Sequence, residues 1–283
     1  MELGQALIWA KDVLAEAGVE EPQLDAEVLL SEATDLSRAG LFTWADRDLT
    51  PKELTRFRSD VYRRAEREPL AYIVGQREFF RLSFAVSPAV LVPRPETELL
   101  VEQALDWLTL PSAPASPRIA DVGTGSGIIA VTLAVHLPTA RILATDTSAD
   151  ALSVAHTNAV RHGVAAQIEF LVGDLLVPVL QPVDLIAANL PYVATSEWET
   201  LMPEIRDYEP RQALDGGPDG LEWVRRLLDA APGCLRPGAV LLAEIGATQG
   251  AAVLDLARSR FPTARIALRR DYAGLDRLFL IQT

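Results

Sequence analysis

Residues 118–137 contain the feature that most constrains the fold of this chain. An apolar run, Arg118-Ile-Ala-Asp-Val122, leads into a turn with glycines at positions 123, 125 and 127, and a second apolar run follows at 128–137. Glycine permits positive φ angles and a close approach of the backbone to a ligand. A strand that passes through such a turn into a helix is typical of an open α/β sheet, in which ligands bind at the carboxyl ends of the strands.

The segments beyond this turn continue the alternation of strand and helix patterns. We predict strands at about 118–122, 141–145, 167–172, 183–188, 238–245 and 265–270, with helices between most of them. This alternation indicates a parallel sheet covered on both faces. The last apolar run, 277–282, follows its predecessor too closely for a crossover helix and is expected to pair antiparallel with it. The expected fold class is therefore α/β and Rossmann-like, with a mostly parallel seven-stranded sheet and an antiparallel last strand.

The residues before Pro69 show helical rather than strand spacing. Apolar residues recur at helical intervals within 3–14, 26–30 and 54–61, and breaks are expected at Gly18, near Gly40 and at Thr50-Pro51. From 76 to 93, apolar residues predict a β-hairpin that turns near Ser87-Pro88, and a helix is expected at about 96–108. We therefore predict a small helical bundle at 1–74, a β-hairpin linker at 75–93 and an α/β domain at 94–283.

Composition narrows the possible locations and partners. The 283 residues carry a net charge of −13 and one cysteine, Cys234, so no internal disulfide can form and a reducing cytoplasm is expected. No apolar stretch has the roughly 20 residues that a membrane span needs, and the N-terminus lacks the pattern of a secretory signal. A chain this acidic lacks the general field that binds nucleic acid, so no stable nucleic-acid binding is expected. We expect no membrane association and a monomer.

Two further groups of residues have the chemical character of a binding site. A local basic patch is conceivable on one helix, although acidic neighbours dilute it and a solvated helix face is the favoured interpretation; its residues are Lys52, Arg56, Arg58, Arg63, Arg64 and Arg67. The three histidines lack the spacing of metal ligands, so no metal site is expected; they are His136, His156 and His162.

The spacing of the glycines identifies the class of ligand. A dinucleotide fingerprint needs glycine at position 128, where this chain has Ile128, so a dehydrogenase is disfavoured. The segment Asp121-Val-Gly-Thr-Gly-Ser-Gly127 instead resembles motif I of class I methyltransferases, which bind S-adenosylmethionine and release S-adenosylhomocysteine. Asp146 ends the second strand, where an acidic side chain can bind both ribose hydroxyls of a nucleoside or cap the next helix. Asp174 and Leu175 follow the third strand and are expected to border the adenine.

The fourth strand ends in a segment with its own chemistry. Asn189-Leu-Pro-Tyr192 resembles the [D/N/S]-P-P-[Y/F/W] motif of methyltransferases that modify a planar, conjugated NH2 group. The lone pair of such a nitrogen is delocalised, which makes it a poor nucleophile. A side-chain oxygen of Asn189 and the carbonyl oxygen of residue 190 can each accept one of its N–H bonds, which holds the nitrogen in place and stabilises the developing positive charge. Tyr192 can pack its ring against the planar group.

Position 190 departs from that motif, because these enzymes commonly have proline there. The required contribution is a carbonyl oxygen, which leucine also has. Pro191 follows and restricts Leu190 toward extended geometry. We therefore expect Asn189, Leu190, Pro191 and Tyr192 to keep the catalytic arrangement.

Five motifs occur in one order along the chain, namely Pro69–Gly75, Leu91-Val-Pro-Arg-Pro-Glu-Thr-Glu98, Asp121–Gly127, Asn189–Tyr192 and Tyr208–Leu221. Together they resemble a single family, the PrmC/HemK protein-(glutamine-N5) methyltransferases of peptide chain release factors. The resemblance implies that the substrate is the glutamine of the Gly-Gly-Gln loop in class 1 release factors. It also implies that the helical domain helps to grip the release factor while the loop inserts between the domains.

The same resemblance implies roles for individual residues. It assigns S-adenosylmethionine to Gly123, Thr124, Gly125, Ser126, Gly127, Asp146, Asp174, Leu175 and Asn189. It assigns the glutamine to Asn189, Leu190, Pro191 and Tyr192, with Arg94, Glu96 and Thr97 shaping the floor of the site. Arg94 is equally interpretable as a structural ion-pair partner, and family members often have an aromatic residue at the position of Leu175.

Other functions remain open at this level. Asn-Leu-Pro-Tyr also resembles the motif of rRNA adenine N6-dimethyltransferases, and an rRNA or DNA adenine N6-methyltransferase is disfavoured by the acidity of the chain and by the position of the helical domain before the catalytic one. A glutamine methyltransferase of a ribosomal protein is a closer alternative. A nucleoside-binding regulatory protein without catalysis is disfavoured by the presence of Asn189 and Tyr192.

Overall fold

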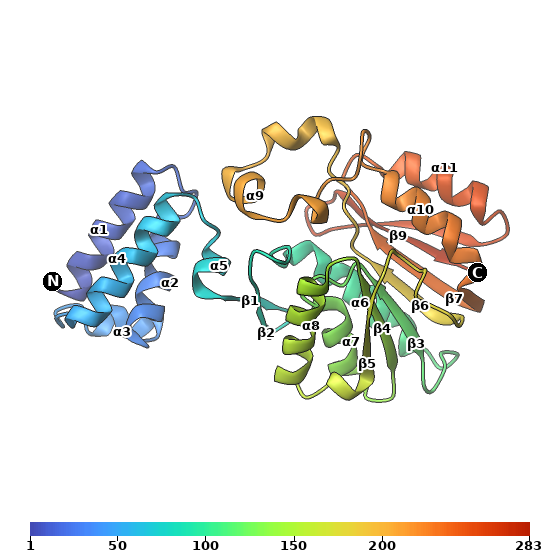
Figure 1. Cartoon of the computed structure of the whole chain (residues 1–283), viewed down its shortest axis with the longest axis horizontal. Coiled ribbons are helices and arrows are strands. Elements are labelled where there is room, and N and C mark those ends of the chain that lie inside the picture. The colour runs from blue at the N-terminus through green and yellow to red at the C-terminus, as the bar shows by residue number, and fades with distance from the viewer. The chain divides into compact units, whose positions relative to one another are not determined.

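The computed structural model describes all residues from Met1 to Thr283. Its internal contacts divide the chain into two compact units. The first consists of Met1–Gln76 together with Met202–Tyr208, and the second of Arg77–Leu201 together with Glu209–Thr283. Figure 1 shows the first unit mainly in blue and the second in green to red. A short segment from the C-terminal half of the chain thus belongs to the N-terminal unit.

The first unit is a bundle of helices around its own apolar core. Its helices are α1 (Leu3–Glu16), α2 (Pro22–Thr34), α3 (Arg38–Thr43), α4 (Pro51–Ala65), α5 (Leu70–Val74) and α9 (Pro203–Tyr208). The core includes the fully buried side chains Leu3, Leu14, Leu29, Leu30 and Phe57.

The helix boundaries follow from local capping. Thr50 and Glu53 form a capping box, and Pro51 takes the first helical position of α4 as predicted. The break predicted near Gly40 is wrong, because Gly40 lies within α3 and donates its N–H to the side chain of the N-cap residue Ser37. A short helix tolerates this glycine because its cap and its packing outweigh the propensity cost.

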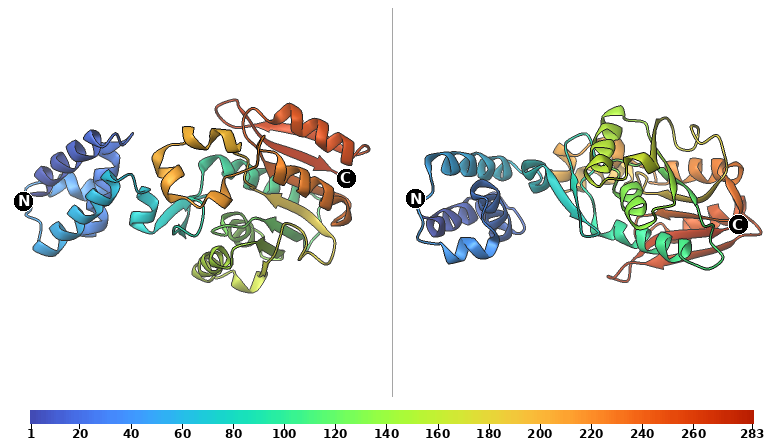
Figure 2. Two further views of the ribbon diagram at one scale, coloured as in Figure 1. Left: turned by 45° about the horizontal axis from the view of Figure 1, so that its top comes forward. Right: turned by 90° about the horizontal axis from the view of Figure 1, so that it is seen from below.

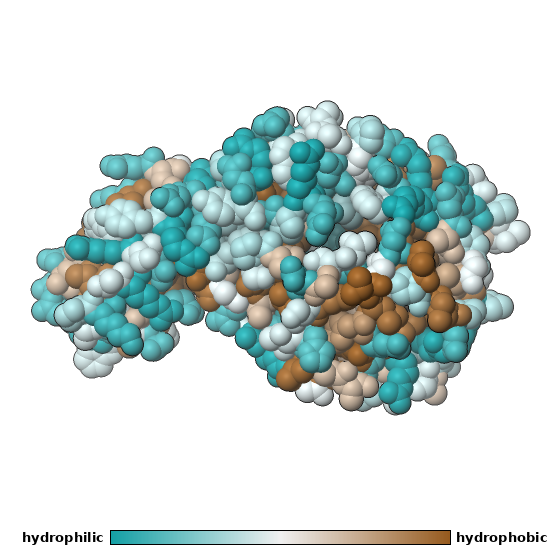
Figure 3. All heavy atoms as spheres, viewed as in Figure 1, coloured by the Kyte–Doolittle hydropathy of each residue, from teal (hydrophilic) through white to brown (hydrophobic).

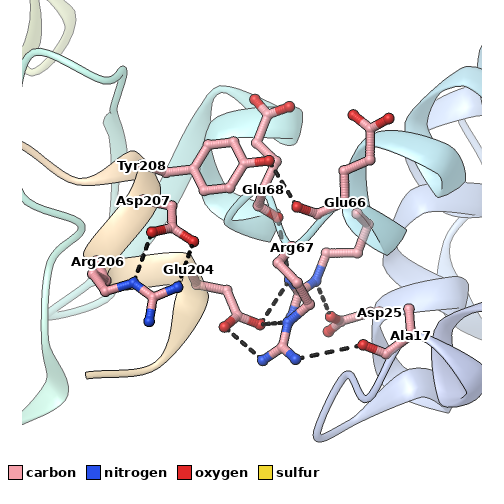
Figure 4. Close-up of polar contacts among 10 residues, drawn as sticks. Ala17, Asp25, Glu66, Arg67, Glu68, Glu204, Arg206, Asp207 and Tyr208 are labelled. Carbon is pink, nitrogen blue, oxygen red and sulfur yellow. Dashed lines mark hydrogen bonds and ion pairs between the residues drawn. The ribbon is translucent and has the colours of Figure 1, made fainter. Parts of the chain in front are cut away.

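The helix α9 is attached to the first unit by ion pairs. Glu204 accepts hydrogen bonds from Arg67 Nε and Nη2, both at 2.7 Å (Figure 4). It also accepts from Arg64 Nη1 at 3.0 Å. Arg64 also donates to Asp25 on α2 at 2.7 Å, and the Tyr208 hydroxyl donates to the Glu66 carbonyl oxygen at 2.7 Å. Burial raises the pKa of Glu204, but the hydrogen bonds from Arg67 and Arg64 outweigh burial, so the pKa is lowered overall and the pairs stay ionised.

This arrangement corrects one interpretation of the sequence. Arg64 does not belong to a solvated helix face, because its side chain is buried between Asp25 and Glu204. Sequence spacing could not reveal this, since Glu204 lies 140 positions further along the chain.

Replacing Glu204 tests the attachment of α9. The substitution Glu204→Gln removes the charge that Arg64 and Arg67 share, and an arginine that is buried without its partner is costly. We expect a loss of about 2 kcal/mol in the free energy that holds α9 in the first unit. Hydrogen exchange should then become faster at residues 202–208, with little change in α1. The control is Asp207→Asn, which removes an exposed carboxylate that pairs only with its neighbour Arg206. Equal protection in both variants would contradict this assignment.

The second unit begins with the β-hairpin β1 (Gln76–Phe79) and β2 (Leu82–Ala85). The predicted turn near Ser87-Pro88 is wrong, because the chain turns at Phe80 and Arg81, whose φ angles are +49° and +61°. Tight hairpin turns with two positive φ angles usually carry Asn or Gly, so this pair gave no sequence signal. The Glu98 side chain accepts the Phe80 N–H at 2.8 Å and so supports the strained turn.

The sheet of the second unit has seven strands in the order β5-β4-β3-β6-β7-β9-β8. The strands are β3 (Arg118–Val122), β4 (Arg141–Asp146), β5 (Ile168–Val172), β6 (Val183–Ala188), β7 (Leu235–Glu244), β8 (Arg265–Arg270) and β9 (Asp276–Gln282). The first five pair parallel, and β9 runs antiparallel between β7 and β8. The predicted fold class, including the antiparallel last strand, is confirmed.

Helices cover both faces of this sheet (Figure 2). The helices of this unit are α6 (Glu98–Leu108), α7 (Ile128–His136), α8 (Ala149–Arg161), α10 (Glu222–Ala230) and α11 (Gly250–Arg260). Short 3-10 helices lie at η1 (Pro95–Thr97), η2 (Ala165–Gln167), η3 (Thr195–Thr200), η4 (Arg211–Ala213) and η5 (Ala231–Gly233). One core lies between the sheet and α6, α7 and α8, and the other between the sheet and α10 and α11.

The surface of the second unit carries some apolar side chains. Val172, Val177 and Leu180 are exposed around the loop between β5 and β6, and the space-filling view shows hydrophobic residues gathered on this unit (Figure 3). None of the helices combines the length and the apolar character that crossing a membrane would require.

Candidate active site

A cavity in the second unit lies at the carboxyl ends of the parallel strands. Its walls bring together many of the residues that the sequence singled out, namely Arg94, Gly123, Thr124, Gly125, Ser126, Asp146, Asp174, Leu175, Asn189, Leu190 and Pro191. Further lining comes from residues that the sequence did not single out, including Ala89, Thr147 and Trp223. Gly127, Tyr192, Glu96 and Thr97 do not line the cavity, and Glu96 is exposed.

The glycine-rich turn forms one wall through its backbone. Gly123, Gly125 and Gly127 have φ angles of +72°, +55° and +81°, which side chains rarely adopt. The N–H groups of Gly123 and Thr124 both donate to the carbonyl oxygen of Thr145 at 2.9 Å, which ties the turn to β4. A Cβ atom at Gly127 would lie 3.0 Å from the Ala155 Cβ, so glycine is also needed for α7 and α8 to pack. The sequence thus shapes a turn whose backbone faces the cavity.

Asp146 stands at the end of β4 beside this turn. Its carboxylate accepts the Gly125 N–H at 3.0 Å and the Ser148 N–H at 2.9 Å. The side chain that caps α8 is Ser148, which accepts the Ala151 N–H, so Asp146 is not the capping residue. Each carboxylate oxygen has further acceptor capacity, and the side chain lines the cavity. Asp146 is therefore oriented by the backbone while it remains able to accept from hydroxyl groups of a ligand.

Asp174 and Leu175 line the cavity beyond β5. Asp174 pairs with Arg226, which also lies over the ring of Trp223 at 4.8 Å. Leu175 has a φ angle of +48°, an uncommon conformation for a residue with a side chain. Its carbonyl oxygen accepts a hydrogen bond from the Thr145 hydroxyl at 2.9 Å, which holds the strained backbone against β4.

The segment after β6 forms the opposite wall. Asn189, Leu190 and Pro191 line the cavity, and the buried side chain of Leu190 packs toward Gly123, where a Cβ atom would lie 3.2 Å from Leu190 Cδ2. The Asn189 Nδ2 group donates to Thr97 Oγ1 at 3.0 Å. The Leu190 side chain therefore fills space behind the glycine-rich turn and leaves the backbone of the segment at the cavity.

The backbone of this segment is held by residues that lie further along the chain. Val193 exchanges hydrogen bonds with Leu214 and Gly216, and Gln249 donates to the Tyr192 carbonyl oxygen at 2.9 Å. A Cβ atom at Gly216 would lie 2.8 Å from the Pro191 carbonyl oxygen. Only glycine allows this approach, which explains part of the motif Tyr208–Leu221.

The segment 92–98 connects several parts of the site. Glu209 accepts the Val92 N–H at 2.9 Å and pairs with Arg94, so Arg94 is both an ion-pair partner and a lining residue. Thr97, which is fully buried, donates to Glu244 at 2.7 Å. Glu244 also accepts the Tyr192 hydroxyl at 3.0 Å. Burial raises the pKa of the Tyr192 phenol, with the nearby charge of Glu244 adding to it, so the phenol stays protonated.

Sequence reasoning assigned no role to Glu209, Glu244 or Gln249, although each contacts the predicted site. For Glu244 a signal was present, because a carboxylate at the end of an apolar strand points to the edge of a parallel sheet where ligands bind. Glu209 and Gln249 lie in loops, and their contacts depend on how these loops fold over the sheet.

Comparisons with known proteins place this chain in a family. Residues 5–75 match the model of the PrmC N-terminal domain, and residues 97–205 match the methyltransferase small domain. The release factor glutamine methyltransferase of Moorella thermoacetica is 48% identical over 281 residues, which span 99% of this chain and 98% of that one. That of Geobacter sulfurreducens is 45% identical over 97% of this chain and 94% of its own. The chain belongs to the release factor glutamine methyltransferase family.

Solved structures agree with this family at the level of the fold. A methyltransferase from Pyrococcus furiosus has a TM-score of 0.52 and 18% identity, covering 72% of this chain and 89% of its own. A human methyltransferase 10 domain-containing protein has a TM-score of 0.51 and 19% identity, covering 71% of this chain and 90% of its own. The second unit of this family member therefore has a methyltransferase fold.

Asp121 gives a stability test of the glycine-rich turn. Its carboxyl is fully buried, one oxygen accepts from the Thr124 hydroxyl and the Ala130 N–H, and the other has no partner. Burial raises the pKa of Asp121 to about 7, against the hydrogen bonds that lower it. The pKa of Asp121 is higher in the folded state than in the unfolded state. The stability that its protonation contributes is therefore fully present below the unfolded-state pKa and is lost as the pH rises through 7.

The substitution Asp121→Asn removes this titration. Between pH 6 and pH 8.5 the parent protein should lose about 1 kcal/mol more of its unfolding free energy than the variant loses. Urea denaturation of both proteins at the two pH values measures the difference. If both lost the same amount, Asp121 would not titrate in this range.

Proposed function

We propose that this protein transfers a methyl group from S-adenosylmethionine to the side-chain amide nitrogen of the glutamine in the Gly-Gly-Gln loop of class 1 peptide chain release factors. The observation that carries the proposal is the composition of one cavity. The glycine-rich turn and Asp146 form one wall, and Asn189, Leu190 and Pro191 form another. The wall that would hold a nucleoside and the segment that would hold an amide thus share one space. Relatives with 48% and 45% identity are named release factor glutamine methyltransferases.

The residues present fit S-adenosylmethionine. The positive φ angles at positions 123, 125 and 127 open the turn so that no Cβ atom covers it. Gly123, Thr124, Gly125 and Ser126 would hold the cofactor through this turn, and Gly127 would keep the turn in shape. Asp146 would accept from the ribose hydroxyls, and Asp174 and Leu175 would border the adenine. When bound, the cofactor supplies an electrophilic methyl group, which is attached to a positively charged sulfur.

The protein's own task is to hold and activate the amide nitrogen. The Asn189 side-chain oxygen and the Leu190 carbonyl oxygen accept the two N–H bonds of the glutamine amide. These oxygens orient the nitrogen and stabilise the positive charge that it gains as it takes up the methyl group. The nitrogen would gain its bond to the methyl carbon as that carbon leaves the sulfur. One of the two nitrogen protons then passes to solvent, and the product keeps one N–H. Pro191 restricts the backbone of Leu190, and Tyr192, anchored through its hydroxyl to Glu244, offers its ring to the planar group.

The remaining proposals concern the protein substrate. We assign residues 1–74 to recognition of the release factor, 75–93 to a linker and 94–283 to catalysis. Arg94, Glu96 and Thr97 are proposed to shape the floor of the glutamine site. The chain is proposed to act in the cytoplasm as a monomer, without stable binding to nucleic acid.

A labelling assay tests the substrate. Purified protein with S-adenosylmethionine labelled in its methyl group is offered a class 1 release factor, ribosomal proteins and rRNA in parallel. We expect the label on the release factor, within the peptide that contains Gly-Gly-Gln. A release factor with alanine in place of that glutamine is the matched control and should remain unlabelled. Label on a ribosomal protein or on rRNA, with none on the release factor, would overturn the assignment.

A pair of variants tests the amide-binding segment. Asn189→Ala removes one acceptor of the substrate amide, and we expect turnover to fall by on the order of 10²–10³ while cofactor binding persists. Leu190→Met keeps the carbonyl oxygen and a similar side-chain volume, so turnover should stay within about two- to threefold of the parent. Kinetics and cofactor titration of both variants give the comparison. Normal turnover in Asn189→Ala would show that this side chain does not take part.

A further inference from the structure

Glu244 is a buried carboxylate that does not line the cavity, yet it contacts two side chains of the site. Only 2% of its surface is exposed, and it lies at the end of β7. One oxygen accepts from Thr97 Oγ1 at 2.7 Å, and the other accepts from the Tyr192 hydroxyl at 3.0 Å. Glu244 therefore links Tyr192 with Thr97, and Thr97 in turn contacts Asn189.

The chemical groups of Glu244, Thr97 and Asn189 determine which of them donates and which accepts in these hydrogen bonds. Both oxygens of Glu244 accept, one from Thr97 and one from Tyr192, so the single hydroxyl hydrogen of Thr97 points to Glu244. The Thr97 oxygen can then only accept from its other neighbour, the Asn189 side chain, which lies at 3.0 Å. The Asn189 amide must therefore turn its NH2 group toward Thr97. Its oxygen is left for another partner, because an inverted amide would place two acceptors against each other.

We infer that Thr97 and Glu244 are positioning residues, which hold the Asn189 amide with its oxygen, rather than its NH2 group, available to the substrate. This inference rests on the proposed function, in which the substrate is an amide NH2 group. Such a group donates two hydrogen bonds and needs two acceptors. An inverted Asn189 would offer N–H groups to N–H groups and repel the substrate. The same carboxylate also sets the position of the Tyr192 ring.

The cost of burying Glu244 supports a functional role. Burial raises the pKa of Glu244 above its ordinary value, against the hydrogen bonds from the Thr97 and Tyr192 hydroxyls and the positive charge of Arg277, which lower it. A neutral side chain of the same shape would be easier to bury at this position. The fold nevertheless places a carboxylate here, and only an acceptor at both oxygens can direct the two hydroxyls at once.

Two substitutions at Thr97 test the inference. Thr97→Val keeps the shape but removes the hydroxyl, so nothing holds the Asn189 amide in one orientation. We expect kcat on the release factor to fall on the order of 10- to 100-fold, with cofactor affinity unchanged. Thr97→Ser restores the hydroxyl and should recover kcat to within about threefold. The control is Thr132→Val, which removes another fully buried hydroxyl, on α7, that has no hydrogen-bond partner and should leave kcat unchanged.

Glu244→Gln separates positioning from stability. The amide can accept from one hydroxyl only, because its other end is a donor, so either Thr97 or Tyr192 loses its acceptor. We expect kcat per folded molecule to fall about 10-fold, while the melting temperature stays the same or rises. A merely structural residue would show the opposite pattern, with a lower melting temperature and an unchanged kcat.

The outcomes distinguish this inference from the proposed function. If the parent protein does not label the release factor, the proposed function fails. If the parent does label it while Thr97→Val turns over as fast as Thr97→Ser, or while Glu244→Gln keeps the full kcat, the positioning role fails alone.

Discussion

The parallel pairing of β3 with β6 is the constraint on which the site depends. Val122 is aligned with Ala188 across this pair and with Thr145 across the neighbouring pair with β4. The residues that follow these three positions are Gly123, Asn189 and Asp146, so all of them leave the sheet at the same edge. The strands are buried on both faces, and a slip of one residue would move every side chain to the opposite face. The hydrophobic core therefore sets the register of the strands, and this register brings Gly123, Asn189 and Asp146 to one edge of the sheet.

Close packing of backbone, rather than side-chain contact, then shapes both walls of the cavity. On the cofactor side, the glycines of the turn allow α7 and α8 to approach and leave the backbone open to the cavity. On the substrate side, Gly216 and Gly220 lie against the backbone of Pro191 and Tyr192, where no side chain would fit. The segments to which we assign the reaction are thus supported by segments outside the proposed site. This explains why motifs without reactive groups accompany the reactive ones.

Buried charges are placed where they direct hydrogen bonds or fasten segments together. Glu244 lies at the end of β7, whose residue Ala243 is aligned with Ala188, so this carboxylate reaches the site from the adjacent strand. Glu204 is used differently, since it binds two arginines and fastens α9 to the helical unit (Figure 4). A carboxylate in the interior is costly unless donors surround it, and both have such donors. The donors around Glu244 thus join side chains of the proposed site in the second unit, and the donors around Glu204 fasten α9 within the first.

The sequence by itself determined the sheet, the glycine-rich turn and the place of the segment Asn189–Tyr192 at the end of a strand, because their signals are local. Alternation of apolar runs and glycines at fixed spacing depends on neighbours in the chain, and the strand limits followed closely from it. The sequence did not predict the hairpin turn at Phe80-Arg81, because these two residues disfavour positive φ angles. Tertiary contacts, such as the hydrogen bond with Glu98, stabilise this backbone conformation. Only the tertiary structure decided that Arg64 is buried, that hydrogen bonds join Glu244, Thr97 and Asn189, and that α9 belongs to the helical unit. Those contacts join residues that lie tens of positions or more apart, so no local pattern in the sequence predicts them.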